Sequence, residues 1–497
     1  MIFDLLAQGD PIHTAIAVSG NGPVVTYDQL RQQVDALAVK LCQLGLGRGD
    51  RIAMALPNGL EVIASFLAAS TVGTAAPLNP AYTRDEFKFY LEDTGARALI
   101  LPSNGADEAR AAAGDDVMII AAALDSRGQV QFSSEQNAGA GRGRDYPNAG
   151  DTALILHTSG TTSRPKRVPL SHANLITSAR NVAQTYELTS DDVSLCVMPL
   201  FHVHGLVAST LATLGTGGSV VVPPKFNPLS FWSTVREHRV TWYSAVPTIH
   251  QVLLSRAKSL RPSGSEQLRF IRSCSAALAP QTMADIEERF GVPILEAYGM
   301  TEAAHQMASN PLPPGARKAG SVGRGTAVDI AILDKAGELL RPGETGEVSI
   351  KGANVFSGYE GNAEANAESF SAGWFRTGDQ GYLDGEGYLT LVGRIKELIN
   401  RGGEKISPRE IDEALLTHPA VAEAVCFGIA DRVYGEEVAA AVVLKASATE
   451  AELTAHCHSS LSDFKCPKTI YLVEEIPRTA TGKIQRRNVA AAITRKL

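Results

Sequence analysis

The chain has 497 residues, 44% of them hydrophobic and 20% charged, and at ~150 residues per domain its length predicts about three folding units. The net charge of −7 argues against a nucleic-acid-binding protein, because such a protein needs a basic face to displace counterions from phosphates. The six cysteines are scattered without a CxxC pair, which predicts reduced thiols and no disulfides.

The first residues and the hydropathy of the sequence indicate in which cellular compartment the protein is expected. Residues 1–14 have no positive segment ahead of their apolar residues, and no uninterrupted apolar run approaches the ~18 residues of a membrane span. We therefore expect neither a signal peptide nor a membrane span, and we predict a cytoplasmic protein. The C-terminal Arg495-Lys496-Leu497 faintly resembles the peroxisomal S-K-L address, so a peroxisomal location stays open.

Helices and strands alternate over the first part of the chain. A capping box at Thr26 to Gln29 opens a helix whose apolar residues, from Leu30 to Leu44, recur at three- and four-residue steps. We expect a buried strand at residues 51–56, a second helix at 60–70, and a further short strand that ends at Pro77. This alternation predicts βαβ units and a parallel sheet.

The pattern changes along the rest of the chain. Residues 133–144 are predicted to form an exposed connector, after which a strand at 152–156 resumes the alternation. Short alternating strands over 320–393, with a hairpin signal at Asp384-Gly385, predict an antiparallel or barrel-like portion. The predicted fold class is α/β: a large N-terminal domain of α/β sub-sheets with a β-barrel-like portion, followed by a small mobile α+β C-terminal domain.

The loop from Thr158 to Lys166 contains five hydroxyls, one glycine and two cations, between a predicted strand and a predicted helix capped by Ser171. Backbone N–H groups, hydroxyl donors and positive charge are what a triphosphate requires. The loop is not a Walker A motif, because Pro165 and Arg167 stand where that motif has Gly and a hydroxyl. A solvated Ser/Thr-rich turn explains the hydroxyls equally well, so the loop alone leaves both interpretations open.

The segment His157 to Lys166, HTSGTTSRPK, resembles the core motif of the adenylate-forming superfamily of acyl-CoA synthetases, firefly-type luciferases and non-ribosomal adenylation domains. Most members have Gly after the lysine, whereas this chain has Arg167, which removes a positive-φ option and adds a charge. The resemblance implies that ATP phosphates are bound by a set of loop residues: Thr158, Ser159, Gly160, Thr161, Thr162 and Lys166.

Further segments of the superfamily follow in order, and the resemblance assigns them nucleotide contacts. In YGMTE, the ring of Tyr298 stacks on adenine, Thr301 reaches the phosphate, and Glu302 holds Mg²⁺, an ion that prefers one or two carboxylates together with phosphate oxygens. Asp379, at the end of WFRTGD, binds the ribose hydroxyls. The nucleotide contacts that the resemblance implies outside the loop are Ser275, Ala276, Ala277, Tyr298, Gly299, Thr301, Asp379 and Arg394.

The remaining segments resemble a gate, a hinge and a final lysine motif. PLFHVHG resembles the gate beside the acyl pocket, and its His202 joins Thr301 and Glu302 as a catalytic candidate. Lys483, in RTATGK, corresponds to the lysine that serves adenylation, since a cation delivered from a mobile tail neutralises charge that develops on phosphoryl oxygens. Lys396, in GRIK, corresponds to the hinge, and the resemblance places Gly402-Gly403 at the pantetheine tunnel for coenzyme A.

Taken singly, these segments have ordinary explanations. Glu302 could be a surface carboxylate, residues 483–487 a solvated or nucleic-acid-binding basic run, and Gly402-Gly403 a simple turn. His202 and His204 could bind a metal on a strand face, although no second pair with metal-ligand spacing follows. A third metal ligand would be His157 or Cys196.

The residues around the predicted acyl pocket favour a small diacid. Non-ribosomal adenylation domains carry an Asp in the gate region to pair with an amino group, whereas this chain has FHVHG, which argues against an amino acid substrate. Burial of a second carboxylate without partners costs several kcal/mol. A pocket lined by His204, Ser275 and His305 therefore suits a short diacid better than an alkyl chain.

The complete amino-acid sequences of several segments resemble those of the oxalate-CoA ligases of plants and fungi, especially over about the last 350 residues. The segments are HTSGTTSRPK followed by VPL, PLFHVHGL, AYGMTEAAHQMASNPLP, GWFRTGD and LVGRIKELINRGGEKISP. The resemblance implies that oxalate and MgATP give an acyl-adenylate and diphosphate, and that the thiol of coenzyme A then displaces AMP to give oxalyl-CoA. It also implies an N-terminal adenylation domain at 1–393, a hinge at 394–396 and a mobile C-terminal domain at 397–497.

Two alternatives remain open at this point. One is a CoA ligase for malonate or for another small or aryl carboxylate, and the other is a non-catalytic nucleotide-binding protein of the same fold. The expected partners are the small-molecule carboxylate, ATP and coenzyme A, with no nucleic acid and no membrane span, in a monomer or a homodimer.

Overall fold

The computed structural model describes residues 1–134, 141–143, 145–158, 165–257, 261–479 and 483–494. Most of the predicted connector at 133–144 thus lies outside the described residues. Among the helices of these described ranges, none is both long and apolar enough to cross a membrane.

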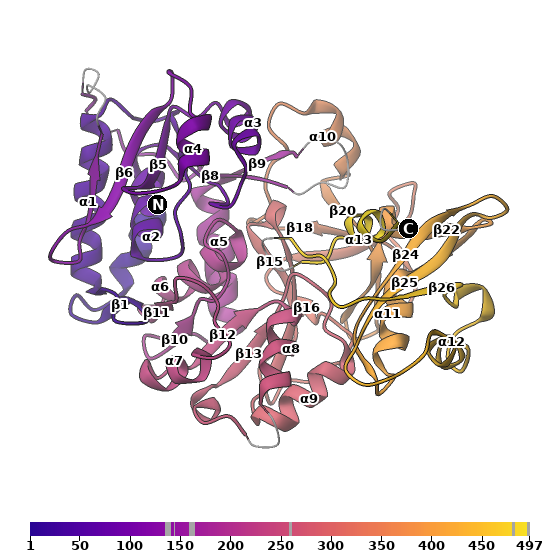
Figure 1. The fold of residues 1–497 in the computed structure, drawn as a ribbon. Helices are drawn as coiled ribbons and strands as arrows, with labels where there is room; N and C mark the ends of the chain where they lie inside the picture. The colour runs from indigo at the N-terminus through magenta and orange to yellow at the C-terminus, as the bar shows by residue number, and fades with distance from the viewer. Residues whose placement is uncertain (135–140, 144, 159–164, 258–260, 480–482, 495–497) are drawn as a thin grey trace.

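One sheet runs in the order β7-β6-β5-β3-β4-β8-β9, and its strands β5, β6, β8 and β9 are labelled in Figure 1. Neighbours from β6 to β8 are parallel, which confirms the predicted βαβ alternation, while β7 and β9 are antiparallel edges. Its strands are β3 (Arg51–Met54), β4 (Thr74–Pro77), β5 (Ala98–Pro102), β6 (Met118–Leu124), β7 (Val130–Ser133), β8 (Thr152–His157) and β9 (Arg167–Ser171). The helices of this region are α1 (Tyr27–Gln43), α2 (Leu60–Val72), α3 (Arg84–Thr94) and α4 (Asp107–Ala112), after the 3₁₀ helix η1 (Ile2–Gln8).

The capping box of α1 forms as the sequence predicts. The Gln29 N–H donates to Thr26 Oγ1 at 3.3 Å, and the Thr26 N–H donates to Gln29 Oε1 at 2.9 Å. The predicted apolar face is buried, but the helix ends at Gln43, so Leu44 is its C-cap rather than its last turn.

A second sheet runs in the order β16-β15-β14-β13-β12-β10-β11-β1-β2. Strands from β14 to β1 are parallel in this order, so their carboxyl ends lie at one edge. Its strands are β1 (Thr14–Val18), β2 (Val24–Thr26), β10 (Val193–Leu195), β11 (Ser219–Val222), β12 (Trp242–Ala245), β13 (Phe270–Ser273), β14 (Ile294–Met300), β15 (His305–Ser309) and β16 (Arg324–Gly325). The helices of this region are α5 (His172–Thr185), η2 (His204–Leu211), α6 (Ala212–Leu214), α7 (Phe231–Glu237), α8 (Pro247–Arg256), η3 (Ser265–Gln267), α9 (Pro280–Phe290) and η4 (Thr301–Ala303).

Helix α2 lies between the two sheets. It contacts β3, β4, β6 and β8 of the first sheet and β1 of the second. Every residue of α2 except Glu61 is buried, which explains why its sequence is apolar on all sides rather than on one stripe. The two sheets therefore share one hydrophobic core around this helix.

The antiparallel portion predicted at 320–393 forms a sheet in the order β17-β18-β20-β19, with β21 paired to β20. The predicted Asp384-Gly385 hairpin connects β20 to β21, and the Gly387 N–H donates to the Asp384 carbonyl at 3.0 Å. The elements are β17 (Asp329–Leu333), β18 (Gly346–Lys351), α10 (Ala363–Ser369), β19 (Phe370–Ser371), β20 (Trp374–Leu383) and β21 (Leu389–Arg394).

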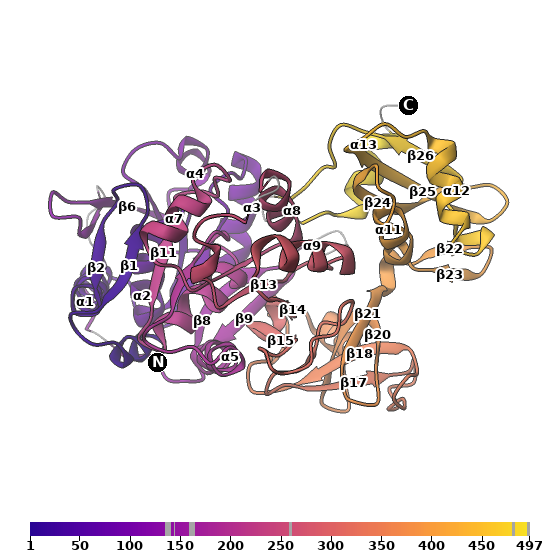
Figure 2. The ribbon, with the colours of Figure 1, turned by 90° about the horizontal axis from the view of Figure 1, so that it is seen from below.

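The C-terminal elements form a separate lobe with hydrophobic clusters of their own (Figure 2). Two side chains of this lobe hold the strand that leads into it: Ser407 Oγ donates to the Val392 carbonyl at 2.7 Å, and Arg409 Nη1 donates to the Leu391 carbonyl at 2.9 Å. The elements are η5 (Ile395–Glu397), β22 (Ile399–Arg401), β23 (Glu404–Ile406), α11 (Pro408–Leu416), β24 (Val421–Asp431), β25 (Gly435–Leu444), α12 (Glu450–His458), η6 (Asp463–Lys465), β26 (Thr469–Leu472) and α13 (Arg486–Thr494). The large N-terminal region and the smaller C-terminal lobe confirm the predicted α/β class.

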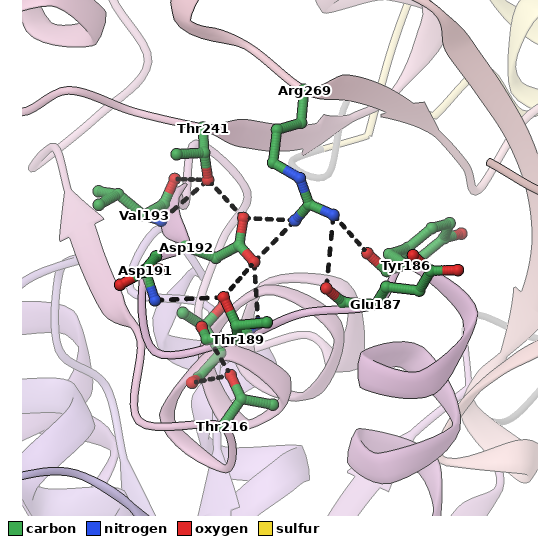
Figure 3. A network of polar contacts seen from close by, with 10 residues as sticks. Tyr186, Glu187, Thr189, Asp191, Asp192, Val193, Thr216, Thr241 and Arg269 are labelled. Atoms are coloured by element: carbon green, nitrogen blue, oxygen red, sulfur yellow. Dashed lines mark hydrogen bonds and ion pairs between the residues drawn. The ribbon is translucent and has the colours of Figure 1, made fainter. Parts of the chain in front are cut away.

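A polar network ties together the amino ends of three neighbouring strands of the second sheet (Figure 3). Asp192 precedes β10 directly, Thr241 precedes β12, and Arg269 precedes β13. The Asp192 carboxylate is 2% exposed and accepts from Thr241 Oγ1 at 2.8 Å, from Arg269 Nη1 at 2.6 and 2.7 Å, and from the Thr189 N–H at 2.9 Å. Arg269 Nη2 also donates to the Tyr186 carbonyl after α5, so the network fixes the helix to the sheet.

We predict that Asp192→Ala lowers the free energy of unfolding of the N-terminal region by about 3 kcal/mol, because it leaves a guanidinium and two further donors without their acceptor. Urea unfolding followed by tryptophan fluorescence measures the effect. The matched control is Arg97→Ala, which removes a more exposed ion pair with Asp50 at 2.9 Å. Equal shifts of the midpoint in the two variants would contradict the structural role given to Asp192.

Candidate active site

The phosphate loop connects two antiparallel strands. The sequence predicts that it leads directly into the helix capped by Ser171, but β9 intervenes between the loop and α5. The Thr158 N–H donates to the Lys166 carbonyl at 3.0 Å, and the Lys166 N–H donates to Thr158 Oγ1 at 3.4 Å, so these two residues close the base of the loop. The predicted contacts Ser159, Gly160, Thr161 and Thr162 lie outside the described residues.

Lys166 lies beside the predicted magnesium ligand. Its Nζ is 4.3 Å from the centre of the Tyr359 ring, and the Tyr359 hydroxyl donates to Glu302 Oε1 at 2.8 Å. Burial, followed by the positive charge of Lys396, lowers the pKa of Lys166. Tyr359 was not among the sequence candidates, because its role depends on the return of a distant segment to the loop.

Arg167 stands where most superfamily members have Gly, and its side chain contacts Asp93 and Glu360. Its guanidinium donates to the Asp93 carbonyl and lies 3.7 Å from the carboxylates of both Asp93 and Glu360. His157, at the other side of the loop, forms a 2.9 Å contact through Nε2 with the same Asp93. Both strands that carry the loop are thus anchored to α3.

Glu302 is 6% exposed, in the single-turn helix η4 that follows β14. Burial raises the pKa of its carboxyl, while the hydrogen bond from Tyr359 opposes the shift. In the described part of the chain, no group of three or more His, Cys, Asp and Glu side chains has metal-binding geometry. Glu302 offers a single carboxylate, and Mg²⁺ at nucleotides takes one or two carboxylates together with phosphate oxygens and water, so its role as a magnesium ligand stays a prediction.

Asp379 and Tyr298 meet at the edge of the antiparallel sheet. The Tyr298 hydroxyl donates to Asp379 Oδ2, and Arg394 Nε lies 2.8 Å from Asp379 Oδ1. β20 and β21 place Asp379 directly opposite Arg394, so the pairing of the strands creates this ion pair. Burial raises the pKa of the Asp379 carboxyl, and the positive charge of Arg394 lowers it.

The backbone is strained where the predicted acyl pocket forms. Ser275 (φ 73°), Ala304 (φ 49°) and His305 (φ 126°) all have positive φ, which is uncommon outside glycine and which clusters at functional sites. A Cβ atom at Gly299 would lie 2.1 Å from the His305 carbonyl oxygen, so only glycine allows this close approach.

The three predicted pocket residues converge in space. The rings of His204 and His305 are 5.1 Å apart, and His204 Nδ1 is 3.1 Å from Ser275 Oγ. Burial lowers the pKa of both histidines well below the usual value, and the nearby charge of Arg272 lowers each further, so both rings are neutral. His204 Nε2 lies 2.6 Å from Ser244 Oγ, so each nitrogen of this ring has a serine partner and the alternative role as a metal ligand is not supported.

His202 lies beside the pocket and stays neutral as well. Burial, and then the charge of Lys483, lowers its pKa to about 3. The His204 N–H donates to His202 Nδ1 at 3.3 Å, which fixes the ring on the amino end of η2. Ala276 and Ala277 are exposed at the turn after β13, and Thr301 is half-buried in η4.

Arg272 is the main residue that the sequence candidates lacked. It lies in β13 with an exposed fraction of 0%, and it contacts Ser244 of the neighbouring strand as well as His305. A charged residue inside an apolar strand of a parallel sheet is exceptional, and that exception within Phe270–Ser273 was the signal that could have revealed it.

Lys483 reaches the site from the C-terminal lobe. Burial lowers the pKa of Lys483. The positive charge of Arg394 lowers this pKa further, whereas Cys274, Glu302 and Asp379 raise it. Gly402 and Gly403 lie elsewhere, at the β22–β23 turn, where the Gly402 N–H donates to the Tyr434 carbonyl at 2.8 Å. The structure therefore brings the predicted lysine, but not the predicted coenzyme A residues, to the nucleotide site.

Comparison with known proteins agrees with this geometry. The model of the AMP-binding enzyme family matches residues 3–360, and that of the AMP-binding enzyme C-terminal domain matches residues 410–483. The chain is 46% identical to an oxalate–CoA ligase of Arabidopsis thaliana, over 98% of this chain and 97% of the relative. It is 47% identical to an oxalate–CoA ligase of Saccharomyces cerevisiae, over 89% of this chain and 87% of the relative.

The solved structures of MatB from Rhodopseudomonas palustris, 31% identical, include an ATP-bound form and an apo form. The ATP-bound form superposes on this chain with a TM-score of 0.88, and the apo form with 0.77, each over 99% of this chain and 98% of MatB. This chain therefore superposes more closely on the ATP-bound form of MatB than on the apo form. From these matches along nearly its whole length, the chain belongs to the AMP-binding enzyme family.

Proposed function

We propose that this enzyme is an ATP-dependent acid–thiol ligase that converts oxalate, ATP and coenzyme A into oxalyl-CoA, AMP and diphosphate. The observation that carries the substrate assignment is the convergence of His204, Ser275 and His305 beside the nucleotide residues. The His305 imidazole and the Ser275 hydroxyl can donate hydrogen bonds to a small anion, with His204 holding Ser275 from behind, whereas an alkyl chain would leave these donors unpaired. The relatives from Arabidopsis thaliana and Saccharomyces cerevisiae described above are oxalate–CoA ligases, which agrees with this assignment.

In the proposed first step, one oxalate oxygen attacks the α-phosphate of ATP, and the α–β phosphoanhydride bond breaks to release diphosphate. Lys166 and Thr158 would hold the phosphates, with Tyr298 against the adenine and Asp379 on the ribose. Mg²⁺ at Glu302 would offset the phosphate charge. Lys483 would neutralise the negative charge that develops on the phosphoryl oxygens.

In the proposed second step, the thiol of coenzyme A loses its proton to solvent and its sulfur attacks the acyl carbon, and AMP leaves with the electron pair of the broken acyl–phosphate bond. His202 is neutral, so its proposed role is to hydrogen-bond the acyl group beside the gate rather than to carry a charge. We propose that the lobe 397–497 turns about 394–396, at Lys396, to bring Gly402 and Gly403 to the site. The proposed hinge follows the N-terminal domain, residues 1–393, and lies between the end of β21 and the start of β22.

We predict that oxalate gives a higher kcat/KM for diphosphate release than malonate, acetate, octanoate or 4-coumarate. The expected order follows from the hydrogen-bonding lining of the pocket, which leaves polar groups unpaired around a longer or apolar acid. Diphosphate release, measured with and without coenzyme A, tests the assignment. A higher kcat/KM for malonate would support the alternative small-acid ligase, and no turnover with any acid would support a non-catalytic protein.

We predict that Lys483→Ala lowers the rate of adenylation by about 100- to 1,000-fold, because it removes a charge that stabilises the transition state. The variant should still convert added oxalyl-adenylate and coenzyme A into the thioester, since Lys483 serves only the first step. The matched control is Lys465→Ala, a lysine of the same lobe that pairs with Glu410 at 2.7 Å away from the site. Loss of both half-reactions in Lys483→Ala would contradict the assigned role.

The pH dependence of the first step provides a separate test. Burial lowers the pKa of Lys483 from the usual 10.5, so the positive charge is present below the lowered pKa and is lost as the pH rises through it. Adenylation should therefore decline on the alkaline side before an exposed lysine would titrate. In Lys483→Arg this alkaline decline should disappear, because a guanidinium stays charged; an unchanged profile would exclude Lys483 as the titrating group.

A further inference from the structure

Arg272 is a buried cation with uncharged hydrogen-bond partners. Its exposed fraction is 0%, and it donates from Nε to the Tyr186 hydroxyl at 2.9 Å, from Nη1 to Ser244 Oγ at 2.9 Å, and from Nη2 to Gln306 Oε1 at 3.1 Å. Nη2 also lies 3.4 Å from His305 Nδ1. Within the described ranges, no ion pair joins Arg272 to a carboxylate, although a buried charge is costly unless it is paired.

Arg272 sets the direction of the hydrogen bonds that reach His204. A guanidinium only donates, so Ser244 Oγ accepts from Arg272. The hydroxyl proton of Ser244 then has His204 Nε2, 2.6 Å away, as its acceptor among the hydrogen bonds of the described side chains, and we assign that bond from Ser244 to His204. The neutral His204 ring then carries its proton on Nδ1 and donates it to Ser275 Oγ at 3.1 Å. The hydroxyl proton of Ser275 is consequently left to donate to a ligand.

The same logic applies to His305. Its Nδ1 faces the Nη2 donor of Arg272 and accepts from it, so the proton of this neutral ring lies on Nε2. Arg272 therefore fixes which nitrogen of His204 and of His305 carries the proton, and it leaves the Ser275 hydroxyl free to donate. The strained backbone of Ser275 and His305 holds these groups in place.

We infer that Arg272 is the positioning residue that makes the acyl pocket selective for a small acid with a second carboxylate. Through Ser244 and His204 it presents the Ser275 hydroxyl as a donor, and directly it presents His305 Nε2–H. Its unpaired positive charge favours a ligand that brings a second negative charge close by. This inference rests on the proposed function, and it names the group that distinguishes a diacid from a monoacid of the same size.

The test compares oxalate with glyoxylate, in which an aldehyde replaces the second carboxylate. In Arg272→Met, kcat/KM for adenylation of oxalate should fall by at least about 100-fold. The kcat/KM for adenylation of glyoxylate should fall less than about tenfold. The selectivity ratio, kcat/KM for oxalate divided by kcat/KM for glyoxylate, should therefore decrease. The matched control is Arg269→Met, three residues earlier, which removes the Asp192 ion pair and should lower stability while leaving the ratio unchanged.

A second measurement follows the hydrogen-bond directions themselves. The ¹⁵N resonances of labelled histidine side chains distinguish the two tautomers, and His204→Gln and His305→Gln assign the two signals. The wild-type enzyme should have the proton of His204 on Nδ1 and that of His305 on Nε2. In Arg272→Met both rings should become mixtures, whereas Arg269→Met should leave them unchanged.

The possible failures are distinguishable. If the wild-type enzyme prefers another acid to oxalate, the proposed function is wrong, whatever the tautomers are. If it uses oxalate but Arg272→Met keeps both the selectivity ratio and the tautomers, only the role of Arg272 is wrong. Should Arg272→Met fail to fold, Arg272→Lys provides the test, because an ammonium keeps the charge but cannot reach all four acceptors; an unchanged tautomer pattern there would overturn the inference.

Discussion

The site depends on one constraint, the parallel pairing of β10, β12, β13 and β14. Parallel strands end at a common edge, and ligands of open α/β sheets bind outside those carboxyl ends. The gate segment follows β10, residues 273–277 span the end of β13, and YGMTE spans the end of β14. Segments that are up to a hundred residues apart in the chain therefore meet, and the Asp192 network holds together the opposite ends of β10, β12 and β13.

Unusual backbone geometry also gathers at that edge. Ser275, Ala304 and His305 have positive φ, and Gly299 approaches the His305 carbonyl closely, all at or just beyond the ends of β13, β14 and β15. Positions of this kind persist only when the surrounding structure fixes them. The sheet that carries these residues shares its hydrophobic core with the first sheet through the almost fully buried helix α2, and the stability of that core supports an unfavourable local geometry.

Much of the fold and the site could be predicted because the signals are local. The capping box at Thr26, the hairpin at Asp384-Gly385 and the βαβ alternation depend on neighbouring residues. Of the residues named from the superfamily motifs, His204, Ser275 and His305 lie together, as do Tyr298, Asp379 and Arg394, whereas Gly402 and Gly403 lie elsewhere. β9 was missed because KRVPLS looks polar, and its antiparallel pairing depends on β8. Sequence reasoning missed Tyr359, Ser244 and Arg272, because the proposed roles of these residues arise from contacts between distant segments. Arg272 could have been found, since a charged residue within an apolar strand is unusual.

The connection between the N-terminal region and the C-terminal lobe is asymmetric. The bonds from Ser407 and Arg409 in the lobe end on the main-chain carbonyls of Val392 and Leu391. A carbonyl is present whatever side chain the residue carries, so substitutions at 391 and 392 leave these acceptors intact. The strength of these two bonds is accordingly set by side chains of the lobe, and natural variation in them should accumulate at 407 and 409 rather than in the strand that they hold.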